Sequence, residues 1–225
     1  MLVISFYISI FLLSLNQLSV LSKSGGMSVY LFDIGVFSFS LLGIFYFLIL
    51  KKSFKIPRYS YLFLLFFLVA AISLFIPSGE LPVDKLLPSF FYLLRYISYL
   101  LSGVVVYNMV DKRILSKKKI DNTFILSGLF IAIAGFIQLI VLPDFTTLDP
   151  DLGWDPHKNR LASTFFDPNF VGAYFVTCLA LILERMFPDK KIKNNHKVDF
   201  WTYFCLIVIL IGLVLTFSRS AWGMM

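Results

Sequence analysis

The dominant pattern along the chain is a series of long apolar runs separated by short polar connections. A helix needs about 20 mostly apolar residues to cross the hydrocarbon core of a bilayer, and several runs reach or approach that length. We expect seven transmembrane helices, at 2–21, 30–50, 59–77, 87–110, 121–143, 170–187 and 199–217. The pattern predicts an all-α, polytopic integral membrane protein with a single transmembrane domain over 1–225.

Composition supports a membrane protein over a soluble one. Hydrophobic residues make up 59% of the chain and charged residues 15%, whereas soluble domains carry about 25% charged residues. The first run lacks a basic leading segment and a good cleavage site, so we interpret it as a retained span rather than a signal peptide. Cys178 and Cys205 both fall within expected spans, where a thiol packs as a small apolar group.

The basic residues set the expected orientation in the membrane. Fourteen of the 20 lie on alternate connections, as the positive-inside rule requires, which places the N-terminus in the cytoplasm. They are Lys51, Lys52, Lys55, Arg58, Lys112, Arg113, Lys117, Lys118, Lys119, Arg185, Lys190, Lys191, Lys193 and Lys197. The net charge of +7 is thereby explained by topology, and we predict no nucleic-acid partner.

The connection at 144–169 is the longest and, in this orientation, faces outward. It holds five aspartates (Asp144, Asp149, Asp151, Asp155 and Asp167) and several prolines, which predict a turn-rich cap. The spacing of Asp149, Asp151 and Asp155 lacks the ligand pattern of a calcium loop, so no metal site and no cofactor are expected. His157 is a candidate general base, although a lone loop histidine is more often solvated.

Arg160 stands shortly before the expected helix start at Asp167-Pro168-Asn169. Asp167 or Asn169 can cap the free backbone N–H groups there. A cation near a positive helix N-terminus favours an anion between them, and phosphate is the natural candidate. The alternative is a surface arginine paired with a loop aspartate.

Two further arginines are candidates for the same anion. Arg219 ends the last expected span between Ser218 and Ser220, and its alternative is to extend toward lipid headgroups. Arg95 lies within the fourth span near Tyr92, Tyr96 and Tyr99, where a charge is costly and indicates function unless it pairs structurally. Together, Arg95, Arg160 and Arg219 could line one outward-facing cavity for a pyrophosphate whose lipid tail lies in the membrane.

The segment 159–172 (NRLASTFFDPNFVG), followed by a span, a basic loop, another span and 216–222 (TFSRSAW), resembles the O-antigen ligase and O-antigen polymerase superfamily. Members of that superfamily assemble polysaccharide such as lipopolysaccharide at the bacterial inner membrane. The motif resemblance covers 140–225, and the remainder is similar only in hydropathy. It implies a multi-pass protein of the cytoplasmic membrane and cell envelope.

The resemblance also implies a reaction: glycan transfer from an undecaprenyl-pyrophosphate carrier by a metal-independent, inverting glycosyltransferase of the GT-C type. Arg160 and Arg219 match the family's arginines that hold the pyrophosphate, with Asp167, Asn169, Ser218 and Ser220 in support. The family's catalytic histidine lies on a later outer loop, onto which His157 cannot be mapped. We therefore expect this sequence to be the N-terminal part of a longer enzyme, and the catalytic base stays unassigned.

Two other functions remain open at this point. A transporter or flippase for an anionic lipid-linked glycan would use the same arginines without chemistry, although no repeat of the kind common in transporters is visible. A noncatalytic membrane component of a polysaccharide assembly complex is the other. The sequence leaves open whether the enzyme would be a ligase or a polymerase, which sugar and acceptor it would use, and its oligomeric state.

Overall fold

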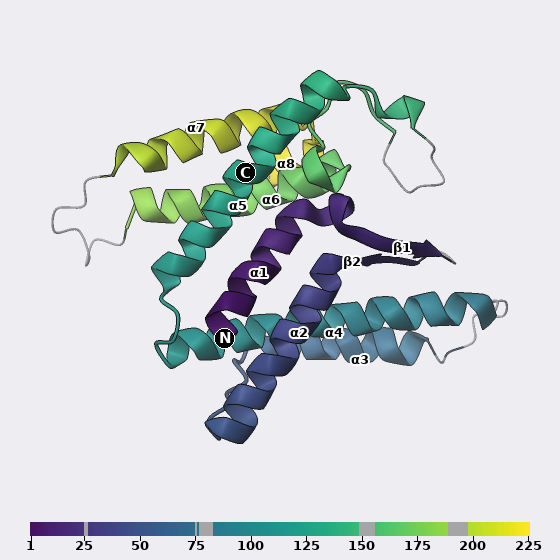
Figure 1. Ribbon diagram of the computed structural model, residues 1–225, viewed down its shortest axis with the longest axis vertical. Helices are drawn as coiled ribbons and strands as arrows, with labels where there is room; N and C mark the ends of the chain where they lie inside the picture. Colours follow the sequence, from purple (N-terminus) through teal and green to yellow (C-terminus); the bar gives the residue numbers. More distant parts are fainter. Residues whose placement is uncertain (25–26, 75, 77–82, 149–155, 189–197) are drawn as a thin grey trace. The chain divides into compact units, whose positions relative to one another are not determined.

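The computed structural model describes residues 1–24, 27–74, 76, 83–148, 156–188 and 198–225 (Figure 1). Within that part of the chain the fold is built almost entirely of helices, as predicted. The α-helices are α1 (Leu2–Leu15), α2 (Leu31–Phe45), α3 (Ser60–Ser73), α4 (Val83–Asp111), α5 (Lys117–Val141), α6 (Pro168–Met186), α7 (Phe200–Leu215) and α8 (Arg219–Met224). Short helical turns follow α1 (Asn16–Ser19) and α2 (Tyr46–Leu50), and two more lie at Phe145–Thr147 and Ser163–Phe165.

The fold contains one short β-hairpin beside its helices, which the sequence did not predict. The connection after the first span is an antiparallel hairpin of β1 (Val20–Ser24) and β2 (Met27–Tyr30), with Val20 opposite Tyr30 and Ser22 opposite Val29 (Figure 1). β-Branched and aromatic residues favour such strands. The segment is too short and too mixed in polarity for this pairing to stand out beside the long apolar runs.

In the described part of the chain, five helices are long and apolar enough to cross a membrane: Leu2–Ser19, Leu31–Leu50, Leu86–Asp111, Lys117–Val141 and Pro168–Met186. The other two expected spans are shorter, with 14 residues in α3 and 16 in α7. At a rise of about 1.5 Å per residue, each falls short of a hydrocarbon core about 30 Å thick. Multi-pass membrane character is thus supported, while seven crossings and their orientation stay predictions.

The chain forms two compact units, Met1–Lys119 and Ile120–Met225. In the first unit α2 packs against both α1 and α4. Gly43 permits the closest approach to α4, because a Cβ at this position would lie 2.3 Å from a methyl carbon of Val105. The Ser40 hydroxyl also donates a hydrogen bond to the backbone oxygen of Ser98, at 3.0 Å.

The second unit has a buried core shared by α5, α6 and α7, and α6 and α7 run side by side (Figure 1). Phe175 of α6 is fully buried, and Gly212 of α7 leaves room for its ring: a Cβ at Gly212 would lie 2.9 Å from it. Gly128 of α5 likewise faces Cys178 of α6. Small residues at these crossings are typical of membrane helices, whose backbones approach closely.

Candidate functional site

The segment that follows Arg160 enters the second unit instead of lying above it. Leu161, Ala162, Ser163 and Thr164 are all buried. The Ser163 hydroxyl donates a hydrogen bond of 2.6 Å to the backbone oxygen of Ile131, which lies ten residues, or about 15 Å, before the end of α5. The connection at 144–169 is therefore not a cap over its whole length, because residues 161–164 reach between the helices.

Gln138 of α5 holds this segment in place. Its side-chain oxygen accepts hydrogen bonds from the backbone N–H groups of Ala162 (2.9 Å) and Ser163 (3.1 Å), while its amide nitrogen donates to the backbone oxygen of Leu142 (2.8 Å). Gly135, one turn earlier, makes room for Leu161. Sequence reasoning missed Gln138, whose only signal was an amide side chain among the apolar residues 128–143.

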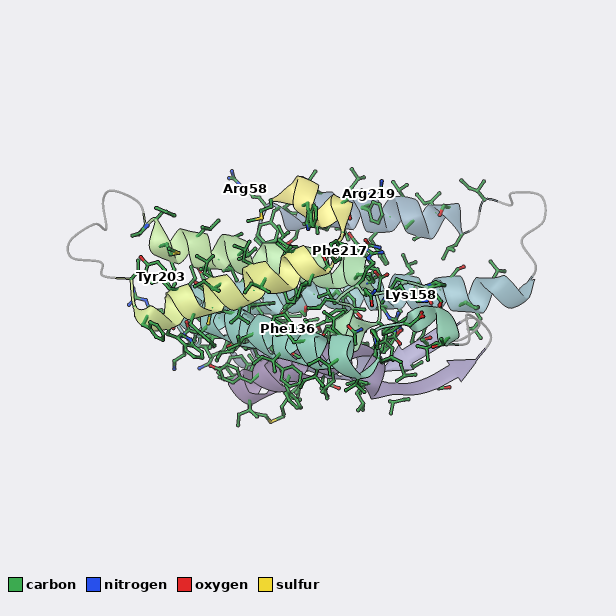
Figure 2. All side chains as sticks on the ribbon, turned by 90° about the horizontal axis from the view of Figure 1, so that it is seen from above. Arg58, Phe136, Lys158, Tyr203, Phe217 and Arg219 are labelled. Atoms are coloured by element: carbon green, nitrogen blue, oxygen red, sulfur yellow. The ribbon has the colours of Figure 1, made fainter. Side chains whose placement is uncertain are left out.

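The opposite wall is the turn that joins α7 to α8. Phe217 adopts a left-handed backbone conformation with φ 49°, which is unusual for a bulky residue. Two hydrogen bonds hold the turn around Phe217. The Ser218 N–H donates to the Thr216 hydroxyl (3.2 Å), and the Ser218 hydroxyl accepts from the Ala221 N–H (3.3 Å). Phe217 and Arg219 lie where α7 passes into α8 (Figure 2).

Arg160 joins the two walls through its guanidinium group. Its Nε donates to the backbone oxygen of Thr216 at 2.9 Å, and one terminal nitrogen lies 3.4 Å from the amide oxygen of Asn169. The same oxygen accepts from the Ser218 hydroxyl at 3.0 Å, and the hydroxyls of Ser218 and Ser220 are 3.0 Å apart. Residues far apart in the sequence thus form one polar cluster.

Next to this cluster is a cavity of about 470 Å³, lined by Arg160, Asn169, Phe217, Arg219 and Ser220. Arg160 is partly buried and Arg219 is exposed. Among the described residues no carboxylate lines the cavity, and neither arginine has an ion-pair partner. The cavity therefore carries two positive charges, along with hydroxyl and amide groups that can donate hydrogen bonds.

The two described aspartates of the connection are engaged elsewhere. Asp144 forms an ion pair of 2.7 Å with Lys158, and hydrogen bonds from Lys158 and Thr146 lower the pKa of its carboxyl to about 2. Asp167 caps α6, as predicted, by accepting from the N–H groups of Asn169 (2.7 Å) and Phe170 (3.4 Å). Asp149, Asp151 and Asp155 lie outside the described residues, which contain no cluster of potential metal ligands.

Arg95 belongs to the first unit, where it forms an ion pair of 2.7 Å with Asp33 of α2. The Tyr99 hydroxyl donates to the other oxygen of that carboxylate at 2.6 Å, and the Tyr92 ring centre lies 5.1 Å from the guanidinium. Sequence reasoning missed Asp33, whose signal was an acidic residue three positions into an apolar run. The role of Arg95 as a third pyrophosphate ligand stays a prediction.

His157 is not solvated, contrary to the more common behaviour of loop histidines. It is only 5% exposed, and its ring stacks on that of Phe145 with 4.4 Å between the ring centres. The backbone oxygen of His157 also accepts from the Phe145 N–H at 2.9 Å. These contacts give His157 a packing role within the connection.

Gly172 of α6 lets the turn at Ser218 come close, which gives a testable prediction. A Cβ at Gly172 would lie 2.7 Å from the Cβ of Ala221 and 3.3 Å from that of Ser218. We expect Gly172→Ala to lower the free energy of unfolding by about 1–3 kcal/mol through overpacking, measured by circular dichroism during unfolding in sodium dodecyl sulfate.

Ala221→Gly added to Gly172→Ala should recover part of that loss, because it removes the nearest clashing atom. Gly103→Ala is the matched control, since a Cβ at Gly103 meets nothing within 4 Å. Alanine is favoured in helices, so this control should leave stability equal or slightly higher. Equal stability of the Gly172→Ala variant and the wild type would contradict the close approach.

Comparison with known proteins adds no relative: no protein family, curated protein or solved structure matches this chain.

Proposed function

We propose that the cavity between Arg160 and Arg219 binds the pyrophosphate of a polyprenyl-linked glycan, and that the protein takes part in glycan transfer of the O-antigen ligase or polymerase kind. The observation that carries the proposal is that these two arginines, from separate segments, line one cavity together with Asn169 and Ser220. The resemblance of 159–172 and 216–222 to that superfamily supports it. The five helices that are long and apolar enough to cross a membrane, counted over the described residues, suit a substrate with a lipid anchor.

The chemistry of the cavity favours a diphosphate over a neutral sugar. Two guanidinium groups meet several oxygens of an anion with paired, charge-assisted hydrogen bonds, which are shorter and stronger than neutral ones. No carboxylate among the described lining residues opposes the anion. Ser220 and the Asn169 amide can donate to the remaining oxygens.

The arginines would stabilise the leaving group during transfer. The bond between the anomeric carbon and the pyrophosphate oxygen breaks, and the bond electrons stay with the pyrophosphate, whose added charge Arg160 and Arg219 neutralise. An acceptor hydroxyl forms the new bond to the anomeric carbon and gives up its proton to a base. Electrostatic stabilisation of developing charge is commonly the largest single contribution to enzymatic rate. We assign that contribution to the two arginines and assign no residue as the base.

The distribution of basic residues also supports a location in the cell for the proposed activity. We propose the bacterial cytoplasmic membrane, with the cavity facing outward, because the basic residues gather on the alternate connections. A carrier lipid would then lie in the outer leaflet with its pyrophosphate in the cavity. Whether the acceptor is another repeat unit or a lipid distinguishes a polymerase from a ligase.

Binding of undecaprenyl pyrophosphate tests the proposal directly. Arg160→Ala and Arg219→Ala should each weaken binding about tenfold to a hundredfold, because a hydrogen bond to a charged group contributes about 1.5–3 kcal/mol. Arg→Lys at either position should recover only part of the affinity, since lysine lacks the forked donor set. Native mass spectrometry of the purified protein with the added lipid measures the bound fraction.

Arg58→Ala is the control, because Arg58 is a cation of a basic connection outside the cavity. Wild-type affinity in both arginine variants of the cavity would refute the pyrophosphate site. The same variants, introduced into the host, should also shorten or abolish surface polysaccharide. Loss of binding with unchanged surface polysaccharide would exclude glycan transfer as the role of the cavity.

A further inference from the structure

The first unit contains a second cavity, chemically unlike the one at Arg160. It has a volume of about 190 Å³ and lies between α2 and α4. Its lining is mostly apolar, with Ile34, Phe37, Phe91 and Leu94 among the residues that form it. A cavity of this kind takes an apolar ligand, with a few polar groups to orient it.

The polar groups of this cavity are Asp33, Arg95, Ser98 and Tyr99. The Asp33–Arg95 ion pair is largely buried, with side-chain exposures of 11% and 15%. Because each charge neutralises the other, the pair presents almost no net charge to a ligand. A second anion would be repelled by Asp33, which argues against a phosphate bound here.

One hydrogen-bond donor of the Arg95 guanidinium has no acceptor among the described residues. A terminal nitrogen of Arg95 donates to Asp33 and to the backbone oxygen of Ser28, but its Nε is buried without an acceptor in the described part of the chain. A buried polar group without a partner costs about 1–3 kcal/mol. The site therefore favours a ligand that brings one uncharged acceptor to an otherwise apolar cavity.

The position of the pair within the helices restricts the ligand further. Asp33 is the third residue of α2, so the polar groups lie at the end of this helix that follows the hairpin. Ile34 and Phe37 follow along α2 toward its middle, and both are about half exposed. The cavity thus holds an ion pair near the start of α2, with apolar side chains before and after it along the lining segments.

We propose that this cavity binds a membrane phospholipid, with an acyl chain in the apolar part and an ester carbonyl accepting a hydrogen bond from Arg95 Nε. The ester carbonyl is an uncharged acceptor at the head of an apolar chain, and it lies near the hydrocarbon boundary where helices end. Because the ion pair is neutral overall, binding depends on the ester and the chain and little on the headgroup charge.

Native mass spectrometry of the purified protein with defined lipids tests this. Diacyl phosphatidylethanolamine and diacyl phosphatidylglycerol should bind within about threefold of each other. The dialkyl ether analogue, which lacks the carbonyl, should bind about tenfold or more weakly, as expected for a lost hydrogen bond to a charged donor. Equal binding of ester and ether lipids would overturn the assignment.

Leu94→Trp fills the apolar part without changing the ion pair and should lower phospholipid binding about tenfold. Leu87→Trp is the matched control, two turns earlier on α4 and outside the cavity lining, and should bind as the wild type does. Circular dichroism of both variants checks that each is folded. A folded Leu94→Trp variant with wild-type binding would contradict the location of the site.

Discussion

Replacement of Arg95 with leucine is expected to lower the free energy of unfolding by about 3–5 kcal/mol, the usual cost of removing one partner from a buried ion pair. The variant leaves Asp33 with its Tyr99 hydrogen bond but without the cation 2.7 Å from its carboxylate. The pair links α2 to α4, so their packing should loosen together. Unfolding in sodium dodecyl sulfate, followed by circular dichroism, measures the change.

The double variant Asp33→Leu with Arg95→Leu separates the cost of an unpaired charge from the value of the pair. Replacing both partners of a buried pair with apolar side chains is often neutral or stabilising. We expect the double variant to be more stable than Arg95→Leu alone. Arg58→Leu, which removes a basic residue from a connection, is the control and should change little. If the single and double variants lose equal stability, the pair is not the source of the effect.

The helices could be predicted from the sequence because their signal is local. Runs such as 121–143 and 170–187 are mostly apolar, and the structure places α5 and α6 there with shifts of a few residues. The ends of α3 are harder to predict, because hydropathy continues beyond the last helical residue. Apolar character shows that a segment avoids water, and only hydrogen bonding decides where its helix ends.

The candidate site could be predicted in part. Arg160 and Arg219 were expected at the same side of the membrane, and the structure places both on one cavity. The contacts that hold them there depend on tertiary structure: Arg160 Nε meets the backbone oxygen of Thr216 only after α7 has packed beside α6. Backbone acceptors have no sequence signature, so this hydrogen bond could not be inferred.

Polar residues within apolar runs were the signals that sequence reasoning undervalued. Asp33 and Gln138 each stand alone in a long hydrophobic stretch, and each proves to be a central hydrogen-bonding partner in its unit. A buried polar group needs a partner, so its presence predicts a contact without naming the residue that makes it. The partner of Asp33 is Arg95, 62 positions away, and the first partner of Gln138 is Ala162, 24 positions away.

Gln138→Leu should have the largest effect in the second unit, because it removes the acceptor of two buried N–H groups at once. Each buried donor left without an acceptor costs about 1–3 kcal/mol, so we expect the free energy of unfolding to fall by about 2–6 kcal/mol. The segment from Ala162 onward would lose its anchor to α5, and Arg160, two residues earlier, would lose its fixed position. Undecaprenyl pyrophosphate binding should weaken together with stability.

The Gln138→Glu variant tests whether the acceptor oxygen at position 138, rather than the glutamine side chain as a whole, holds the segment at Ala162 and Ser163. A glutamic acid side chain keeps an acceptor for both N–H groups, and in its protonated form its O–H replaces the amide as the donor to the Leu142 oxygen. The facing carbonyl oxygen favours this protonated form, because an ionised carboxylate would be repelled by it. We expect this variant to retain most of the stability and binding that the leucine variant loses. Hydrogen exchange of the Ala162 and Ser163 amides should rise strongly in Gln138→Leu and little in Gln138→Glu. Protected amides in Gln138→Leu would show that other contacts hold the segment, and that Gln138 does not position Arg160.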